Sequence, residues 1–259
     1  MTAPAHTRTA NVDPHEHTAY PPLERGRVAA RLVGGGLLLA LALTLVGRFV
    51  TGVLTPSALT RWEDSVNKWF VDQRTPTFDL ATHIGSYLAE TVTCIALLVV
   101  MVVVLRAWLG RWRESWAVFA AIVGELLVFL VVTALVDRAR PGVPHLDAAP
   151  PTSSFPSGHV GAAVALYGCL AVIAYREVRN RALSTVLVTV CCIVPVVVAI
   201  SRVYRGMHHV SDVVFGAVGG GLWLLLVVTT LLALPRRAVD SSPLDLRPGT
   251  STDSASRVG

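Results

Sequence analysis

Charged side chains are scarce in this chain of 259 residues. Asp, Glu, Lys and Arg make up only 15% of it, whereas an average soluble domain has roughly 25%. Hydrophobic residues make up 53%, and six runs of them are nearly free of charge: 32–53, 89–105, 116–135, 160–174, 183–200 and 213–234. So many runs of this kind leave too little polar surface to face water. The composition therefore argues against a soluble helical bundle.

The lengths of these runs predict an all-α fold, a polytopic membrane bundle of six transmembrane helices. A helix needs about 20 apolar residues to cross a bilayer, and the six runs fit one membrane domain over residues 28–234. The first run is too long for the apolar part of a signal peptide. We expect it to remain in the protein as the first span. The polar segments 1–27 and 235–259 are expected to be disordered cytoplasmic tails.

Cysteine is also rare, and its placement argues against a disulfide framework or a metal site. The four cysteines lie inside apolar runs, where they act as small hydrophobic residues, and their spacing fits neither kind of site. No metal and no cofactor are expected. The formal net charge of +5 does not indicate a nucleic-acid partner, because the basic residues flank the apolar runs, where they set membrane topology.

The basic residues also predict the orientation. With the N-terminus in the cytoplasm, fourteen of the 22 lie on the inner side, in the segments 8–31, 106–113, 176–181 and 236–257. Inner loops of membrane proteins carry the excess of Lys and Arg. We therefore expect a protein of the plasma membrane whose remaining loops face the extracytoplasmic side.

A patterned segment lies between the first two runs. Its apolar residues recur at three- and four-residue spacing (Leu59, Trp62, Val66, Trp69 and Phe70), and its polar residues occupy the other side (Arg61, Glu63, Asp64, Asn67 and Lys68). The pattern fits a short amphipathic helix in the headgroup region with its Trp rings at the interface. It fits an ordinary packed loop helix equally well.

Three polar segments are predicted to share the outer side. The first is Asp137–Pro141 at the end of the third run, the second is Ser153–His159 before the fourth run, and the third is Ser201–Asp212 between the fifth and sixth runs. Each segment alone is a weak signal. Their convergence on one face of the membrane is what indicates a functional site.

The residue types in these segments suit a phosphate ester. Guanidinium groups bind phosphate oxygens bidentately, and Arg140 and Arg202 supply two of them. Ser157 and Gly158 precede an apolar helix, whose free backbone N–H groups and positive dipole end attract an anion. Gly158 also permits close approach to the backbone. We therefore predict that these four residues bind the phosphate.

The same segments carry candidates for the chemistry. Asp212 follows His208 by four residues, so the two stack on one helical face if the sixth helix begins there. The carboxylate can then hold one imidazole proton and leave the other ring nitrogen free to attack phosphorus. His159 can protonate the leaving oxygen and later accept a proton from water. His209 points about 100° away from His208 on a helix and is expected to have no role.

These segments resemble the signature of the type 2 phosphatidic acid phosphatase family, which shares its core with the vanadium haloperoxidases. That signature is Lys-x6-Arg-Pro, then Pro-Ser-Gly-His, then Ser-Arg-x5-His-x3-Asp. The second part is complete at 156–159, and the third at Ser201, Arg202, His208 and Asp212. In the first part Arg140-Pro141 match, but Thr133 stands where the family has Lys.

The resemblance implies a role for each matching residue. His208 would be the nucleophile, Asp212 its partner and His159 the acid and base. Arg140, Arg202, Ser157 and Gly158 would hold the phosphate without a metal ion. With Lys absent at position 133, Arg138 is a candidate substitute, and a role as an interfacial anchor fits it equally well.

The expected function is a membrane lipid phosphatase that works through a phosphohistidine intermediate. Its substrate would be a phosphomonoester or pyrophosphate of a lipid, such as phosphatidic acid, phosphatidylglycerol phosphate, diacylglycerol pyrophosphate or a polyprenyl pyrophosphate. The alternatives are a lipid phosphotransferase with a hydroxyl acceptor, a haloperoxidase, and a non-catalytic lipid carrier whose site has decayed at Thr133. Glu125, inside the third run, suits a functional or a packing role equally. The oligomeric state is left open.

Overall fold

The computed structural model describes residues 24–54 and 57–232, and these contain helices and no strand. Six of the helices are long and apolar enough to span a membrane. They are α1 (Arg25–Gly52), α4 (Thr91–Leu109), α5 (Arg113–Leu135), α6 (Gly158–Glu177), α7 (Arg181–Tyr204) and α8 (Val210–Val227), which continues as the π-helix η1 (Val228–Leu232). The predicted all-α bundle of six spans is confirmed.

The predicted tails fall almost wholly outside the described residues. α1 begins at Arg25, inside the predicted N-terminal tail, and an ion pair of 2.8 Å between Glu24 and Arg27 lies on its first turn. The helix therefore extends beyond its apolar run into the charged residues that flank it. The prediction of disorder in residues 1–27 and 235–259 otherwise stays a prediction.

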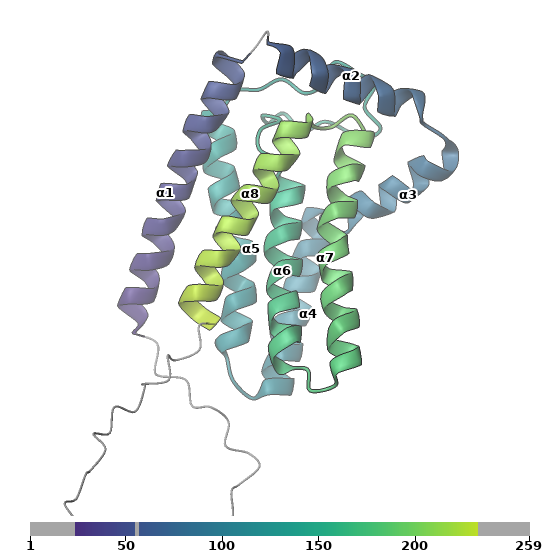
Figure 1. Ribbon diagram of the computed structural model, residues 1–259. Helices are drawn as coiled ribbons and strands as arrows, with labels where there is room; N and C mark the ends of the chain where they lie inside the picture. Colours follow the sequence, from purple (N-terminus) through teal and green to yellow (C-terminus); the bar gives the residue numbers. More distant parts are fainter. Residues whose placement is uncertain (1–23, 55–56, 233–259) are drawn as a thin grey trace, which may run out of the picture. The chain divides into compact units, whose positions relative to one another are not determined.

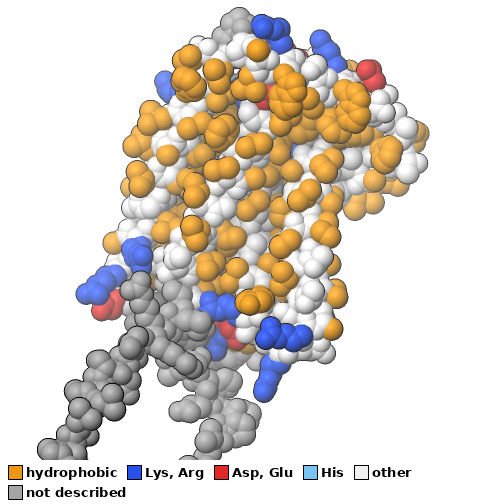
Figure 2. Space-filling view, viewed as in Figure 1, with side chains coloured by type: hydrophobic (Ala, Val, Ile, Leu, Met, Phe, Trp, Pro, Cys, Tyr) orange, Lys and Arg blue, Asp and Glu red, His pale blue; other side chains and the backbone are white. Residues whose placement is uncertain are grey.

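The distribution of apolar side chains is that of a protein in a bilayer. Leu, Val and Ile side chains stand exposed along the outer faces of the spans, and Figure 2 shows them over most of one face, with Lys and Arg near its two ends. In α4 only 11% of the most apolar window is buried inside the protein. A soluble fold would leave few such patches in water. Hydrocarbon is therefore the environment that this surface fits.

The core of the bundle is α6, which packs against α5, α7 and α8. In α6, 56% of the apolar window is buried, the largest share among the six spans. α6 and α8 approach so closely that a Cβ atom at Gly220 would lie 2.5 Å from the Gly161 carbonyl oxygen. Small residues permit such contact between membrane helices. The first turns of α6, which carry Gly158, His159 and Gly161, therefore lie close against α8.

Two shorter helices, α2 (Ala58–Asp72) and α3 (Pro76–Tyr87), connect α1 to α4. α2 contacts α7 and α8, and in Figure 1 it crosses the end of the bundle where α6 and α8 begin. The predicted helix is present, but its most deeply buried residues are polar. Glu63 and Asn67 are 0% and 1% exposed, whereas Trp62 and Trp69 are 51% and 57% exposed. The structure thus turns two polar residues inward and the Trp rings outward.

Candidate active site

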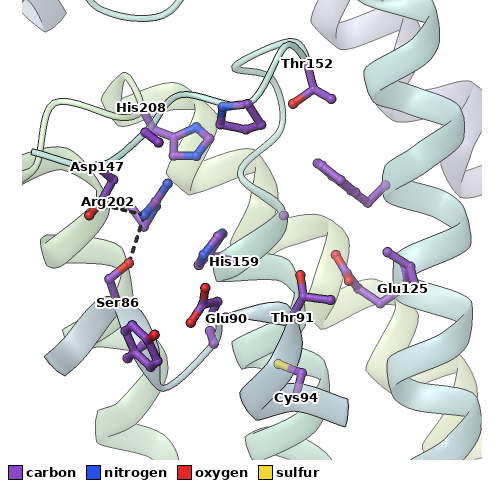
Figure 3. A pocket seen from close by; sticks show the side chains of 18 of the residues that line it. Ser86, Glu90, Thr91, Cys94, Glu125, Asp147, Thr152, His159, Arg202 and His208 are labelled. Carbon is purple, nitrogen blue, oxygen red and sulfur yellow. Dashed lines mark hydrogen bonds and ion pairs between the residues drawn. The ribbon is translucent and has the colours of Figure 1, made fainter. Parts of the chain in front are cut away.

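The three polar segments meet at the end of the bundle that α2 crosses. The loop after α5 carries Arg140, the first turn of α6 carries His159, and the end of α7 carries Arg202. His208 lies in the short turn between α7 and α8. All four residues line a single cavity of about 580 Å³, which Gly158 also lines (Figure 3). The structure therefore brings the predicted segments together.

Arg202 is buried and Arg140 is half-buried, and the hydrogen-bonding groups of both cavity arginines are only partly satisfied. Arg202 donates from Nη1 to Ser86 Oγ at 2.8 Å and forms an ion pair of 3.1 Å with Asp147. Arg140 donates from Nη1 to the Met207 carbonyl at 2.8 Å. The Nε group of each has no partner within the described residues. Buried donors without partners are costly, and an anion in the cavity would satisfy them.

His208 is oriented differently from our expectation. α8 begins at Val210, after His208, so His208 and Asp212 do not stack on one helix. The His208 Nδ1 atom lies 2.8 Å from the Ser154 carbonyl oxygen and 3.8 Å from Asp212 Oδ2. A carbonyl oxygen only accepts, so Nδ1 carries the proton and Nε2 keeps its lone pair. The backbone of Ser154 thus sets the tautomer that a nucleophile requires.

Burial also affects the charge of His208. It lowers the pKa of the imidazole below its ordinary value, and this effect exceeds the opposing attraction of Asp212. The nearby guanidinium groups of Arg202 and Arg140 lower it further. The imidazole is therefore neutral at neutral pH, which is the form that can attack phosphorus.

Ser157 lies beside the cavity but does not line it. The residue is the N-cap of α6, and its N–H donates to the Asp212 carbonyl at 2.9 Å. Its Oγ is buried without a partner among the described residues. Of the predicted Pro-Ser-Gly-His residues, the structure thus places Gly158 and His159 on the cavity wall and Ser157 behind it.

Arg138 does not line the cavity but binds the carboxylate of Asp212. Its Nη1 also donates to Ser211 Oγ at 2.7 Å, and its Nη2 donates to Glu63 at 2.8 Å. These contacts leave the guanidinium facing two carboxylates. The sequence suggested that Arg138 binds phosphate or anchors the chain at the membrane interface. Its position in the structure fits neither role.

Glu63 and Asp212 complete a buried network with Arg138. The second Glu63 oxygen accepts from the Ser211 N–H at 2.7 Å. Asp212 Oδ2 accepts from the His209 N–H at 2.8 Å, and the His209 ring lies 3.3 Å from the same oxygen. His209, which was expected to have no role, thus contacts Asp212 and caps α8. The network ties α2, the loop after α5 and the start of α8 to one another.

Other cavity residues carried no signal in the sequence. Asp147 pairs with Arg205 at 2.6 Å as well as with Arg202, and both arginines lower the pKa of its carboxyl against the effect of burial. Ser86, Glu90 and Thr91 line the cavity from α3 and the start of α4. No motif marks these positions. Only the tertiary contacts place them at the site.

Thr133 lies in α5 and does not line the cavity. Its hydroxyl is buried without a partner among the described residues. Nothing at this position replaces the positive charge that the resembling family has there. The two arginines of the cavity, Arg140 and Arg202, therefore carry the cationic part of the candidate phosphate site.

The fold and this cavity define a polytopic membrane phosphatase. The chain belongs to the PAP2 superfamily, whose family model matches residues 32–236. It is 30% identical over 157 residues to phosphatidylglycerophosphatase B of Bacillus subtilis (strain 168), over 56% of this chain and 70% of that protein. The resemblance noted in the sequence is thus confirmed, and with it the class of enzyme, a phosphoric ester hydrolase.

Two solved structures have the same fold. The crystal structure of the transmembrane PAP2-type phosphatidylglycerolphosphate phosphatase from Bacillus subtilis has a TM-score of 0.62 and 25% identity, and the match covers 76% of this chain and 94% of that one. Aquifex aeolicus LpxE has a TM-score of 0.51 and 18% identity, over 64% and 93% of the two chains. At that identity the second match shows the fold alone.

Proposed function

We propose that this protein hydrolyses a phosphomonoester or pyrophosphate of a membrane lipid through a phosphohistidine intermediate. The observation that carries the proposal is that His208 and His159 line one cavity together with two arginines, each of which has a buried Nε group without a partner among the described residues. Arg140, Arg202 and the first turn of α6 would bind the phosphate oxygens. Such an arrangement holds an anion, a nucleophile and a proton donor within reach of one another.

The reaction follows from the tautomer of His208. Its Nε2 lone pair forms a bond to phosphorus while the ester P–O bond breaks, and His159 gives a proton to the leaving oxygen. His159 then takes a proton from a water molecule, whose oxygen attacks phosphorus as the N–P bond breaks. Inorganic phosphate leaves and both histidines return to their starting states. Asp212 would steady the imidazole as its positive charge develops.

The cavity wall favours a lipid as the substrate. Tyr87, Ile95 and Leu126 line the cavity and are also exposed on the lipid-facing side of α3, α4 and α5. Exposed apolar side chains in a cavity wall let an alkyl chain lie partly in the site and partly in the bilayer. A soluble phosphate ester would gain nothing from that surface.

The proposal predicts phosphate release from lipid phosphates by the purified protein in detergent. Activity should survive EDTA, because the positive charges of Arg140 and Arg202 disfavour a bound cation. Vanadate should inhibit by adopting the five-coordinate geometry of the transition state. Phosphate release measured with each lipid of a panel, with and without EDTA, tests this. Loss of activity on chelation that Mg²⁺ or Zn²⁺ restores would contradict the mechanism, and phosphoryl transfer to an added alcohol would favour the transferase alternative.

The basic loops predict that the site faces the extracytoplasmic side of the plasma membrane. The polar segments and the loops at 106–113 and 176–181 lie at opposite ends of the spans, about 30 Å of hydrocarbon apart. A cysteine introduced at Val143 should react with an impermeant thiol reagent in intact cells. A cysteine at Asn180 should react only after permeabilisation, provided that exposed Cys192 is first replaced. The reverse pattern would place the site in the cytoplasm.

A further inference from the structure

One end of the cavity is lined by carboxyl groups that the mechanism does not use. Glu90 stands at the start of α4 and Glu125 in the middle of α5. Figure 3 shows both on the far side of His159 from Arg202 and His208, with Thr91 between them. The cavity therefore has a cationic end and an acidic end, and His159 lies between the two.

These carboxyl groups lack partners in the protein. Glu125 is 8% exposed, and no hydrogen bond or ion pair holds it within the described residues. The Oε2 atom of Glu90 is buried and has no partner there either. Ionisable groups are expensive in the interior of a membrane protein and are functional candidates by default. Two unpaired carboxyl groups facing one cavity indicate that a ligand completes their hydrogen bonds.

The bundle also makes room for Glu125. A Cβ atom at Gly161 would lie 2.1 Å from its Oε1 atom, so any side chain there would displace the carboxyl group. Gly161 follows His159 by two residues on α6. The absence of a side chain at this position leaves room for the carboxyl group of Glu125 where that residue lines the cavity.

The acidic end of the cavity lies where the leaving group of the substrate would bind. His159 protonates the leaving oxygen, so the phosphate lies toward the arginines and the rest of the leaving group extends past His159. A carboxyl oxygen accepts a hydrogen bond from a hydroxyl group. It supplies no positive charge to bind a second phosphate group.

We propose that Glu90 and Glu125 form a subsite for a free hydroxyl group of the leaving alcohol, next to the scissile ester. The inference rests on the proposed function, because it requires the phosphate to bind at Arg140 and Arg202. A subsite of this kind would favour the phosphomonoester of a polyol as the substrate. A pyrophosphate, whose leaving group is anionic, and a diacylglycerol phosphate, whose leaving group has no free hydroxyl, should be poorer substrates.

A pair of substrates that differ in one hydroxyl group tests the subsite. In 1-acylglycerol 3-phosphate the free 2-hydroxyl is adjacent to the scissile ester, and in 1-acyl-1,3-propanediol 3-phosphate it is replaced by hydrogen. The wild-type protein should prefer the first by about 10-fold in kcat/KM, as expected for one hydrogen bond to a buried polar group. Glu125→Leu should reduce that preference to about 2-fold or less, and Glu125→Gln, which keeps an acceptor, should retain part of it.

The controls separate this inference from the proposed function. Gly161→Ala should displace the carboxyl group and reduce the preference as Glu125→Leu does, which keeps the test available if that variant does not fold. Leu127→Ile, on the lipid-facing side of α5, should leave the preference unchanged. Equal kcat/KM for the two substrates in the wild-type protein, or an unchanged preference in Glu125→Leu, would overturn the subsite. Turnover of both substrates by His208→Ala would instead overturn the proposed mechanism.

Discussion

Replacing His208 by Ala is expected to abolish turnover while the protein remains folded. Removing a nucleophile removes the covalent path, and losses of roughly 10³- to 10⁶-fold in kcat are typical. The side chain makes one short hydrogen bond, to the Ser154 carbonyl, which contributes about 1 kcal/mol to stability. Phosphate release and thermal unfolding in detergent measure the two effects separately. Near-normal turnover of His208→Ala would remove this residue from the mechanism.

The variant His159→Ala tests the proposed proton donor. Without its proton donor, His159→Ala should lose most activity toward alkyl phosphates and retain more toward esters with good leaving groups. Such an ester should then leave a phosphorylated protein, because the second step lacks its base. Radiolabelled substrate detects the intermediate. His145→Ala, an exposed loop residue outside the cavity wall, serves as the matched control and should retain most of the activity.

The spans were predictable because the length of an apolar run is a local property. The run 160–174 lies within α6, Gly158–Glu177, and the other runs coincide with their helices to within a few residues, apart from the longer extension of α1. α3 was not predicted, since a short helix of mixed polarity between Pro76 and Tyr87 has no periodic pattern. The spans therefore follow from composition along the chain and α2 from its amphipathic pattern, whereas α3 had no such local signal.

The candidate site was predictable to the extent that its residues lie in short motifs. Arg140, His159, Arg202 and His208 share one cavity as expected. The contacts that orient them come from distant segments, which no spacing reveals. The partner of His208 is a carbonyl 54 positions away in the chain, and Glu63 lies 75 positions from the arginine that it binds. An amphipathic pattern cannot tell which polar residue of α2 will be buried.

Replacing Arg138 by Met is expected to destabilise the protein by about 3–5 kcal/mol, as observed when one partner of a buried ion pair is removed. Glu63 and Asp212 are both fully buried. Without the guanidinium their negative charges would face each other in a space closed to water. Thermal unfolding in detergent measures the loss. Lys68→Met, at an exposed position on α2, is the matched control and should change stability little.

Arg138→Met also distinguishes a structural role, in which Arg138 holds Asp212 and α2, from a role in phosphate binding. If Arg138 holds Asp212 and α2 in place, Glu63→Met combined with Arg138→Met should recover part of the lost stability, since one unpaired carboxylate has been removed. Vanadate inhibition of the protein that folds should then stay close to the wild-type value, because Arg138 does not line the cavity. A stable Arg138→Met protein that binds vanadate weakly would show the opposite, that Arg138 supplies the charge missing at Thr133.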